Sequence, residues 1–541
     1  MKKFISVLLS FLIVSCCVLA GCSTQKSPKD DPIEGIEAVQ SSDKYRNYYQ
    51  IFVNSFCDSD GDTIGDIPGI ISKLDYLNDG DPNTGDDLGI DGIWLTPIMP
   101  SRSYHKYDVN DYYNIDENFG TLEDFDTLLD ECHKRGINVI IDLVLNHISS
   151  QNPLYLQAVE EVSEGKLDGA AEYFEIHKSD YFSSDIQVNG LGNGYVCEAN
   201  FSHDMPEWNL NSEKTREEFK NIAKFWLDRG VDGFRLDAVK YYTNKSTDGK
   251  EFLKWFYETC RDIKPDVYMV GEDWEDDMYL EGYYESGIDS LFSFKFAQAS
   301  GTIIKNMLTQ KGESTVSKFK SYDEKMTKAN PNFINAMFLS NHDQIRSANA
   351  LKAYGTSFEK FAASVYMLVP GNSFTYYGEE IGMTAPDTTS DANYRTGMIW
   401  DSNNLPDINV NGRDIEQEAP DEGGVEQQLK NDDSLLRFYQ RVIKVKNQNP
   451  EIARGKITDT VDFDDSNIGA YYVEYEGSKL LIIHNFNKTD SKELTITDDM
   501  LKNAEVRADL VTSTTEEHIV LNSDGTLTLP AISTVILKSA E

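Results

Sequence analysis

The sequence predicts an α/β protein built on a (β/α)8 TIM barrel, with a domain inserted after the third strand and a small antiparallel β domain at the C-terminus. Three observations support this fold. Apolar runs typical of buried strands alternate with amphipathic helical segments. One interval between two strands is too long for a single crossover helix. Beyond about residue 449, the alternation gives way to short runs typical of antiparallel strands.

Eight segments have the apolar character of strands in a parallel sheet, and helical stretches lie between many of them. The strands are expected at 48–56, 92–96, 138–145, 233–239, 267–271, 290–294, 336–340 and 373–377. Examples of the helices are 122–135, 213–229 and 252–263. Eight such strands, buried on both faces, suit a closed barrel.

The domain organisation follows from these segments. Residues 43–147 and 209–450 are expected to form the barrel, residues 148–208 the inserted domain and residues 451–541 the C-terminal domain, a β-sandwich. The inserted stretch is rich in Gly, Asn and Tyr around 181–200. In the C-terminal domain, strands are expected at 470–475, 479–485, 493–496, 526–529 and 534–537.

The first 22 residues have the layout of a bacterial secretory signal. Two lysines precede an uncharged apolar run over residues 4–20, and Leu19-Ala20-Gly21-Cys22 resembles a lipobox. Such a signal is cut before the cysteine, so Cys22 would carry a lipid and hold the protein on the extracellular face of the cell envelope, in the cell membrane or the outer membrane. A plain signal peptide and an uncleaved anchor helix are the alternatives. The polar residues 23–42 are predicted to form a flexible tether.

The charge balance restricts the partners of the chain. It has 91 Asp and Glu residues against 50 Lys and Arg residues, for a formal charge of −41. Such a surface repels phosphate backbones, so a nucleic acid is not an expected partner. A neutral polymer or a cation such as Ca²⁺ is compatible with this charge, and we expect a monomer.

Four cysteines remain after the signal region: Cys57, Cys132, Cys197 and Cys260. Their spacing matches no zinc-binding pattern. Buried free thiols and one or two disulfides both remain open.

Carboxyl groups follow three of the predicted strands. Asp237 ends the fourth strand, Glu272 follows the fifth and Asp343 follows the seventh. Because the C-terminal strand ends of a barrel share one rim, these groups should converge. Glycoside hydrolysis needs such a set: a carboxylate that attacks C1 and a carboxylic acid that protonates the leaving oxygen. Arg235 points to the same side of its strand as Asp237 and can keep it ionised.

Two histidines also lie at strand ends of this rim, His147 at the third strand and His342 at the seventh, and they can donate hydrogen bonds to sugar hydroxyls. Each residue alone carries little weight, because a single aspartate at a strand end is more often structural and a single histidine is more often part of the core. The joint arrangement is what predicts an active site.

Four segments carry a resemblance to a known family. They are Asp142-Leu143-Val144-Leu145-Asn146-His147, Gly233-Phe234-Arg235-Leu236-Asp237, Gly271-Glu272 and Ser340-Asn341-His342-Asp343. These segments resemble the four signature regions of the α-amylase family of glycoside hydrolases (family 13). Supporting segments at 92–97, 205–210 and 378–383 occur in the family order. The resemblance implies a TIM barrel, an inserted domain B and a C-terminal domain C, and a retaining hydrolase of starch, maltodextrins and related α-glucans.

The resemblance also implies roles for individual residues. Asp237 would be the nucleophile, Glu272 the general acid/base and Asp343 the stabiliser of the transition state. Residues expected to bind substrate are Tyr107, Asp108, His147, Arg235, Lys240, Tyr241, Asn341, His342 and Arg395. Among these, Tyr107 matches the tyrosine that stacks on the sugar at the cleavage subsite, whereas Tyr241 stands where the family more often has a histidine. Trp274 fits a stacking wall or core packing equally well.

The segment Asp58-Ser59-Asp60-Gly61-Asp62-Thr63-Ile64-Gly65-Asp66 predicts a metal site. Ca²⁺ takes about six to eight oxygen ligands, and this segment offers one at every second position. The expected ligands of a structural Ca²⁺ are the carboxylates of Asp58, Asp60, Asp62 and Asp66 and the backbone carbonyl of Ile64. The segment resembles a calcium loop after the first strand of many family members. A metal-free Asp/Gly-rich turn is the alternative.

Loop residues favour one activity within the family. Strict exo-acting members typically carry an aspartate three positions before the stacking tyrosine, and here that position is Tyr104. We therefore expect an endo-acting α-amylase that cleaves internal α-1,4 bonds. Arg395 and the 58–66 loop favour one alternative, an exo-acting α-glucosidase or oligo-1,6-glucosidase. The stretch Tyr104-His105-Lys106-Tyr107-Asp108 resembles that of neopullulanase-type hydrolases, which are another alternative. A non-catalytic glucan-binding surface lipoprotein is a further alternative, which the presence of all three carboxyls disfavours.

Overall fold

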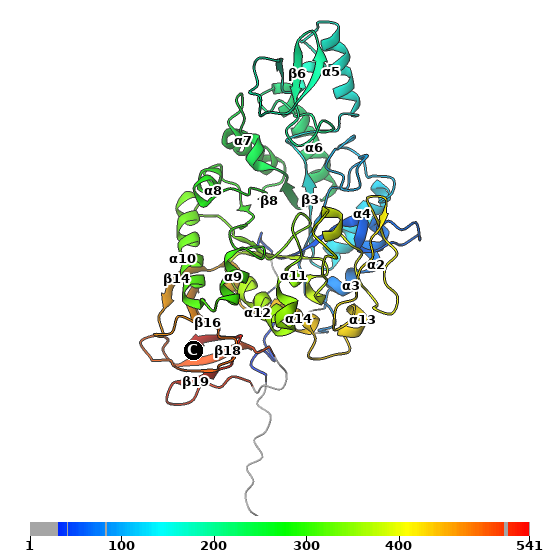
Figure 1. The fold of residues 1–541 in the computed structure, drawn as a ribbon. Coiled ribbons are helices and arrows are strands. Elements are labelled where there is room, and N and C mark those ends of the chain that lie inside the picture. The colour runs from blue at the N-terminus through cyan, green and yellow to red at the C-terminus, as the bar shows by residue number, and fades with distance from the viewer. Residues whose placement is uncertain (1–30, 40–41, 82–83, 513–517, 540–541) are drawn as a thin grey trace, which may run out of the picture.

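The structure is a computed structural model that describes residues 31–39, 42–81, 84–512 and 518–539. The predicted signal peptide, Cys22 and the first part of the predicted tether lie outside these residues. Figure 1 shows three parts: a central barrel, a smaller domain above it that contains α5 and β6, and a β domain below it that contains the C-terminus.

Eight parallel strands form the barrel. They are β1 (Asn47–Ile51), β2 (Gly92–Leu95), β3 (Asn138–Leu143), β7 (Gly233–Leu236), β8 (Tyr268–Gly271), β9 (Ser290–Leu291), β10 (Ala336–Phe338) and β11 (Asn372–Tyr376). Their order in the sheet is β10-β11-β1-β2-β3-β7-β8-β9. A parallel bridge between Phe292 and Ala336 links the two end strands. The predicted TIM barrel is confirmed.

Aromatic side chains fill the inside of the barrel. The ring of Tyr48 stacks on those of Tyr268 and Phe374, with centroid distances of 5.4 and 4.8 Å. Gly92 on the neighbouring strand leaves room for this ring, since a Cβ there would lie 2.6 Å from it. The barrel is therefore a packed core, and polar chemistry is confined to its ends.

The first strand is shorter than predicted. It ends at Ile51, and residues Val53–Phe56 form the short helix α1 instead. All four residues of α1 are buried. An unbroken apolar run of this kind does not distinguish a buried strand from a buried helical turn, which is why the prediction extended the strand too far.

Helices surround the barrel. They are α2 (Ile67–Ser72), α3 (Leu74–Leu77), α4 (Leu122–Lys134), α6 (Glu213–Arg229), α7 (Gly249–Ile263), α8 (Asp277–Tyr284), α9 (Thr302–Leu308), α10 (Gly312–Ala329), α11 (Ser347–Leu351), α12 (Thr356–Met367), α13 (Val425–Gln428), α14 (Leu435–Asn447) and α15 (Pro450–Arg454). Helix α6 has the predicted bounds, because the Ser212 hydroxyl accepts from Thr215 N–H at its start and Gly230, with φ of 111°, ends it. No described helix has the length and apolar character needed to span a membrane.

The interval between β3 and β7 holds a small domain. It contains α5 (Pro153–Ser163) and an antiparallel sheet of β4 (Ile176–Lys178), β5 (Val188–Gly192) and β6 (Tyr195–Glu198), in the order β4-β6-β5. Isolated bridges pair His147 with Glu207 and Phe174 with Trp208. The chain therefore leaves and re-enters the barrel at nearly the same place, which sets this domain above one side of the rim (Figure 1).

The C-terminal part is antiparallel, as predicted. Its strands are β14 (Lys456–Val461), β15 (Ile468–Tyr475), β16 (Ser478–Asn485), β17 (Lys492–Thr495), β18 (Ala504–Leu510), β19 (Thr526–Leu529) and β20 (Ser533–Ser539). The larger sheet has the order β14-β15-β16-β20-β18, and β17 pairs with β19. Strands β14 and β18 were not predicted. A further two-stranded hairpin, β12 (Asn409–Val410) and β13 (Arg413–Asp414), belongs to the barrel part.

Residues 31–39 correct the prediction of a flexible tether over 23–42. Ile33 is buried and belongs to the main hydrophobic core. The Gln448 side chain donates to the carbonyls of Ile33 and Ile36, at 3.2 and 2.7 Å, and Val39 N–H donates to the Asn447 carbonyl (2.8 Å). The prediction was based on the polar composition of this stretch and overlooked Ile33, the buried side chain that packs it against the core.

Candidate active site

The ends of β7 and β8 hold two of the predicted carboxyl groups side by side. Glu272 N–H donates to the Leu236 carbonyl, and Val239 N–H donates to the Glu272 carbonyl, both at 2.9 Å. Ala238 follows Asp237 directly and has a left-handed φ of 52°, which turns the chain away at the rim. Asp237 and Glu272 therefore face the same space from adjacent strands.

Arg235 on β7 is the centre of a buried ionic cluster. Its Nη1 donates to Asp142 Oδ1 (2.8 Å) and to Asp237 Oδ1 (2.7 Å), and its Nη2 lies 2.8 Å from Glu272 Oε2. The side chains of Arg235 and Asp142 are fully buried. Arg235 is thus a partner of Asp237, as the sequence suggested, and it also binds two further carboxylates.

The cluster changes the proton affinity of its carboxyl groups. Burial raises the pKa of Asp237 well above its usual range, and the neighbouring carboxylates act in the same direction, whereas Arg235 opposes the shift. Burial likewise raises the pKa of Asp142 to about 6, again against Arg235. Because several carboxyls share one buried cation, the cluster favours retaining a proton near neutral pH.

The two oxygens of Glu272 have different donors. Trp274 Nε1 donates to Oε1 at 2.6 Å. Ala238 N–H donates to Oε2 at 3.1 Å, on the side that faces Arg235. The Glu272 carboxyl is therefore fixed from both sides, within reach of Asp237.

A hydrogen-bond chain runs under the cluster from β1 to β3. Gln50 Nε2 lies 2.8 Å from His342 Nδ1, and His342 Nε2 lies 2.6 Å from the Tyr107 hydroxyl. That hydroxyl donates to Asp142 Oδ2 (3.0 Å). Burial lowers the pKa of His342 well below its usual range, and nearby arginines act in the same direction, so the ring is neutral. The Gln50 amide donates to Nδ1, which leaves the proton on Nε2.

Arg395 holds the third carboxyl. Its Nη2 donates to Asp343 Oδ1 (2.7 Å), its Nη1 donates to the Tyr104 hydroxyl (2.7 Å), and Asp391 Oδ2 lies 3.0 Å from Nη1. Arg395 is buried, whereas Asp343 is partly exposed at the cavity. The loop after β11 thereby fixes the loop after β10.

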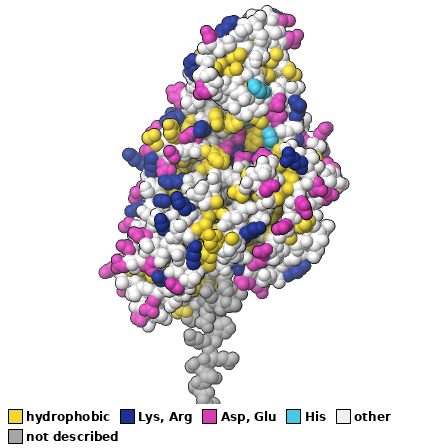
Figure 2. Space-filling view, viewed as in Figure 1, with side chains coloured by type: hydrophobic (Ala, Val, Ile, Leu, Met, Phe, Trp, Pro, Cys, Tyr) yellow, Lys and Arg dark blue, Asp and Glu magenta, His cyan; other side chains and the backbone are white. Residues whose placement is uncertain are grey.

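These groups line a cavity of about 480 Å³ at the C-terminal end of the strands. Its lining residues are His105, Tyr107, His147, Phe201, Met205, Asp237, Ala238, Lys240, Tyr241, Glu272, Trp274, Asp343, Asp391 and Arg395. Figure 2 shows acidic side chains in the hollow below the inserted domain, bordered by hydrophobic side chains. The three predicted carboxyls do converge.

His147 lines this cavity with an unused donor or acceptor. Its Nε2 is buried and has no hydrogen-bond partner among the described residues. Burial lowers the pKa of His147 to about 4, so the ring is neutral near pH 7. A neutral imidazole with a free nitrogen suits a hydroxyl group of a ligand.

Four of the predicted binding residues do not line the cavity. Arg235 and His342 lie beneath it. Asp108 accepts hydrogen bonds from the hydroxyls of Ser101 (2.6 Å) and Ser103, and Asn341 Oδ1 accepts from Asp343 N–H (3.0 Å). The structure thus places Asp108 and Asn341 in loop-supporting positions.

Sequence reasoning missed His105, Phe201, Met205 and Asp391 of the lining. His105, Phe201 and Met205 lie on loops and Asp391 begins a short 3-10 helix, so no hydrophobic period signals which way these side chains point. Phe201 comes from the inserted domain, and its ring packs 4.9 Å from His147 and 4.7 Å from Tyr241. The aromatic composition of the 181–201 stretch was the one available signal.

The acidic loop after α1 brings three of its four aspartates together. Carboxylate oxygens of Asp58, Asp60 and Asp66 lie within 4.8 Å of one another. Asp62 stands outside this group and accepts from Ile64 N–H at 2.8 Å. Asp66 also caps α2, since its Oδ1 accepts from Gly69 N–H (2.6 Å). No ion pair joins these three carboxylates to a cationic side chain in the described part of the chain, and such a cluster fits a divalent cation with oxygen ligands.

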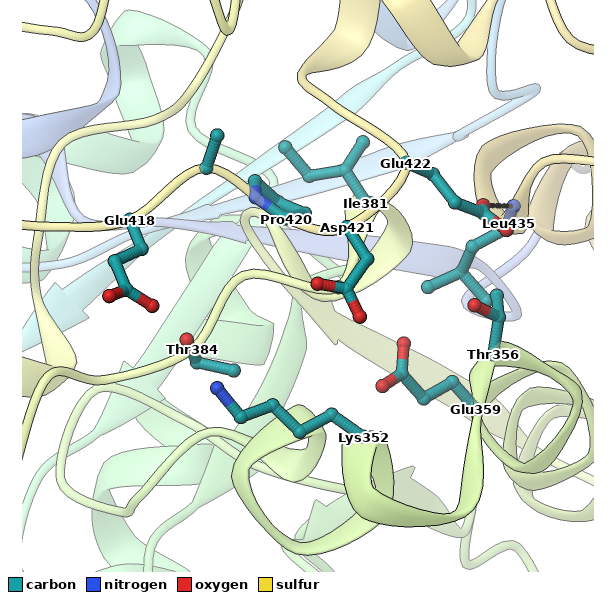
Figure 3. A pocket seen from close by; sticks show the side chains of 12 residues that line it. Lys352, Thr356, Glu359, Ile381, Thr384, Glu418, Pro420, Asp421, Glu422 and Leu435 are labelled. Carbon is teal, nitrogen blue, oxygen red and sulfur yellow. Dashed lines mark hydrogen bonds between the residues drawn. The ribbon is translucent and has the colours of Figure 1, made fainter.

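A second, smaller cavity lies behind the barrel loops, between α12 and residues 418–422 (Figure 3). Asp421 and Glu359 point toward one another, while Glu422 Oε2 accepts from Leu435 N–H (2.8 Å). Burial raises the pKa of Glu359 to about 8, and the charges of Glu422 and Asp421 add to this. Glu359 is therefore protonated at neutral pH.

The four cysteines among the described residues carry free thiols. Cys132, Cys197 and Cys260 are buried, and Cys57 is partly exposed. Burial raises the pKa of each thiol. None of them is poised as a nucleophile.

Comparison with known proteins gives matches over most of the chain. A family model described as the α-amylase catalytic domain matches residues 50–455, and one described as the C-terminal domain of the α-amylase SusG matches residues 468–536. α-Amylase 3 of Dictyoglomus thermophilum is 36% identical over 461 residues, 83% of this chain and 86% of that protein. An oligo-1,6-glucosidase of Bacillus cereus is 28% identical over 535 residues, 81% of this chain and 89% of that protein. The solved structure of Eubacterium rectale Amy13B is similar with a TM-score of 0.85 at 36% identity, covering 95% of this chain and 100% of that chain.

Proposed function

This chain belongs to the α-amylase family of glycoside hydrolases, and from that premise we propose that it cleaves internal α-1,4-glucosidic bonds of starch and maltodextrins with retention of configuration. The observation that carries the proposal is the convergence of Asp237, Glu272 and Asp343 on one cavity, with Arg235 beneath them. A nucleophilic carboxylate beside a carboxylic acid is the pair that retaining hydrolysis uses.

In the proposed mechanism, Asp237 attacks C1 of the sugar. Arg235 holds its Oδ1, which leaves Oδ2 to form the bond to carbon. Glu272 gives its proton to the glycosidic oxygen as the C1–O bond breaks, and a glycosyl-enzyme ester remains. Water then attacks C1, Glu272 takes the proton of that water, and Asp237 is released as carboxylate. The shared proton of the buried cluster is consistent with an ionised nucleophile beside a protonated acid.

The remaining lining residues would bind the sugars. The free Nε2 of His147 can bond a sugar hydroxyl, and Asp343, oriented by Arg395, can grip hydroxyls of the ring at the cleavage site. The Tyr107 ring, stacked at 5.7 Å on His342, offers an aromatic face for the positively charged transition state. Lys240 and Tyr241 also line the cavity, and Lys240 pairs with Glu275, close to Glu272 and Trp274 in the chain, a position that suits the leaving group.

A maltoheptaoside with a chemically blocked non-reducing end tests this proposal. The protein from Asp31 onward should cleave it, and the variant Asp237→Asn should lose this activity by several orders of magnitude, because the glycosyl ester cannot form. Undiminished hydrolysis by the variant would refute the assigned nucleophile. Cleavage of only the unblocked sugar would favour an exo-acting α-glucosidase, the second candidate, which the similarity to an oligo-1,6-glucosidase supports. Glucan binding without any hydrolysis would favour a non-catalytic surface protein.

We also propose that the 58–66 loop binds a structural Ca²⁺. The grouping of Asp58, Asp60 and Asp66 supports this, and the backbone carbonyl of Ile64 and the carboxylate of Asp62 would complete the ligand set after a small movement of the loop. The ion would neutralise clustered negative charge and fix the chain between α1 and α2. It would stand on the β1 side of the barrel and take no part in the chemistry.

We further propose that Cys22 carries a lipid that holds the enzyme on the outside of the cell envelope. The position of residues 31–39 supports this arrangement, because they pack against α14 near residues that precede β2 and β3, opposite the catalytic rim. An anchor attached there would leave the cavity facing away from the membrane. In the producing cell, Cys22→Ala should release the protein from the membrane fraction, whereas Cys57→Ala should not; retention of the first variant would contradict the anchor.

A further inference from the structure

Trp274 lies two residues after Glu272 and lines the same cavity. Its side chain is 46% exposed at the cavity, and one face of its ring stacks on Phe294, with a centroid distance of 4.4 Å and an interplanar angle of 28°. Its Nε1 donates to Glu272 Oε1 at 2.6 Å. The indole is therefore held by one ring and directs its N–H at one carboxyl oxygen.

The surroundings of Glu272 decide which of its oxygens carries the acidic proton. Oε2 accepts a hydrogen bond from the Ala238 N–H at 3.1 Å and forms an ion pair with Arg235, whose Nη2 lies 2.8 Å away. A proton on Oε2 would meet the Ala238 N–H and the positive charge of the Arg235 guanidinium, so Oε2 is the oxygen that stays unprotonated. The proton of the carboxylic acid consequently belongs on Oε1, the oxygen that Trp274 contacts.

We propose that Trp274 is a positioning residue for acid/base catalysis, whose indole N–H orients Glu272 Oε1 and stabilises the negative charge that this oxygen gains as its proton leaves. The inference rests on the proposed function, in which Glu272 is the general acid/base. As the proton moves from Oε1 to the glycosidic oxygen and the C1–O bond breaks, Oε1 becomes anionic and its hydrogen bond from Nε1 strengthens. In the second step, Oε1 takes the proton of the attacking water, and the bond weakens again.

The competing role is that of a passive wall on which the leaving sugar stacks. That role uses the exposed ring face and does not involve Nε1. The variant Trp274→Phe separates the two, because phenylalanine keeps a ring against Phe294 and toward the cavity but lacks the N–H donor. The pH profile of kcat/KM is the readout that a passive wall would not shift.

With maltoheptaose, we expect kcat/KM of Trp274→Phe to fall about tenfold, as for the loss of one hydrogen bond to a charged group. Activity at high pH is lost when the acid loses its proton, and removing an N–H donor favours the protonated carboxyl. The alkaline limb of the profile should therefore move to higher pH. A fall in kcat/KM with an unchanged alkaline limb, or a rise in KM alone, would overturn the proposal in favour of the passive wall.

Two controls distinguish a defect in proton transfer from a general loss of activity and test the role of Glu272 separately. With α-maltosyl fluoride, whose leaving group needs no proton, kcat/KM of Trp274→Phe should stay within about twofold of the wild type, which also shows that the variant is folded. An equal loss on both substrates would overturn the proposal, since the defect would then lie outside proton transfer. Glu272→Gln tests the premise separately: if it hydrolyses maltoheptaose at the wild-type rate, the proposed function of Glu272 fails, whatever Trp274 does.

Discussion

Arg235 is a fully buried cation that binds three carboxylates: Asp142, Asp237 and Glu272. A buried charge is costly unless it is paired, and here the pairing exceeds neutrality by two negative charges. The surplus can be relieved by retaining a proton within the cluster. In the proposed mechanism, a proton retained in this way would serve as the one that the general acid donates.

The variant Asp142→Asn tests this reasoning at one residue. Asp142 is one of the charges that raise the pKa of Asp237, and it competes for Arg235 Nη1. Its replacement by the neutral amide should lower the pKa of Asp237. Because Asp237 must be ionised to act as the proposed nucleophile, activity is lost as pH falls through that pKa, so the acidic limb of kcat/KM should move to lower pH.

The measurement is the pH profile of maltooligosaccharide hydrolysis by both proteins. Asp289→Asn is the matched control, because Asp289 is buried and paired with Lys44, remote from the cavity. It should leave the acidic limb in place. An acidic limb that moves to higher pH in Asp142→Asn would show that Asp142 acts mainly by orienting Arg235.

At the scale of elements, side chains on the loops that follow the strands are available to bind ligands, whereas the helices and strands stabilise the fold. The acidic loop between α1 and α2 illustrates the division. Asp66 is buried and caps α2, whereas Asp60 is exposed and makes no bond that the fold needs beyond its own turn. Asp60 is therefore the suitable probe for a bound cation, and Asp66 is not.

We expect Ca²⁺ to raise the melting temperature of chelator-treated protein and Asp60→Ala to abolish the rise. A ligand that binds only the folded state, at a hundredfold excess over Kd, adds about 3 kcal/mol to the free energy of unfolding. Calorimetry with and without CaCl₂ measures this. Asp130→Ala, an exposed aspartate on α4, should keep the full response. An equal Ca²⁺ response in the wild type and in Asp60→Ala would place the ion elsewhere.

The carboxyl pair between α12 and residues 418–422 gives a second prediction at this scale. Burial, chiefly, raises the pKa of Glu359 in the folded protein to about 8 from the ordinary glutamate value of 4.5. Its contribution to stability is therefore fully present below the unfolded value and is lost as pH rises through about 8. Glu359→Gln cannot ionise and should escape that loss.

Thermal unfolding on either side of this range measures the effect. Relative to the wild type, Glu359→Gln should gain melting temperature at about pH 9 and gain little or nothing at about pH 5. Glu258→Gln, an exposed glutamate on α7, should shift neither value. A change of the same size at both values of pH would mean that packing, and not ionisation, governs this position.

The elements that were predictable are those with a local signal. Helix α6 has both a Ser212 cap and a terminal Gly230, and its bounds were right. Strand β18 was missed because it carries the charged Asp509 in the core. Arg441 on α14 pairs with that aspartate at 2.9 Å across 68 positions of sequence. From the sequence alone, a charged residue is predicted to be exposed, because the partner that allows its burial is not known.

The same limit applies to the site. Asp237, Glu272 and Asp343 could be found because they end strands, and strand ends meet at one rim of a barrel. The Trp274 contact to Glu272, and Phe201 beside His147, depend on loop paths that no hydrophobic period reveals. Topology was thus readable from the sequence, whereas loop geometry required the structure.

At the scale of the whole molecule, the N-terminal segment, the barrel and the C-terminal domain meet at the end opposite the active site. Arg441 on α14 binds Asp31 through both carboxylate oxygens and binds Asp509 of the C-terminal sheet. His518 Nδ1 lies 3.0 Å from Asp509 Oδ2. One arginine therefore joins the N-terminal segment, the barrel and the β domain.

This junction predicts that residues 31–39 stabilise the folded enzyme. A chain that begins at Ser42 loses the buried Ile33, worth about 2 kcal/mol for a large aliphatic side chain, and the pairing of Asp31 with Arg441. It should melt several degrees below a chain that begins at Asp31, while the two have equal kcat/KM, because the catalytic rim lies at the other end of the strands. Ile33→Ser in the longer chain should reproduce part of the loss, and Glu34→Ser, an exposed neighbour, should not. Equal melting temperatures for the two chains would mean that the segment contributes no net stability, and that the polar stretch acts as a tether up to the barrel itself.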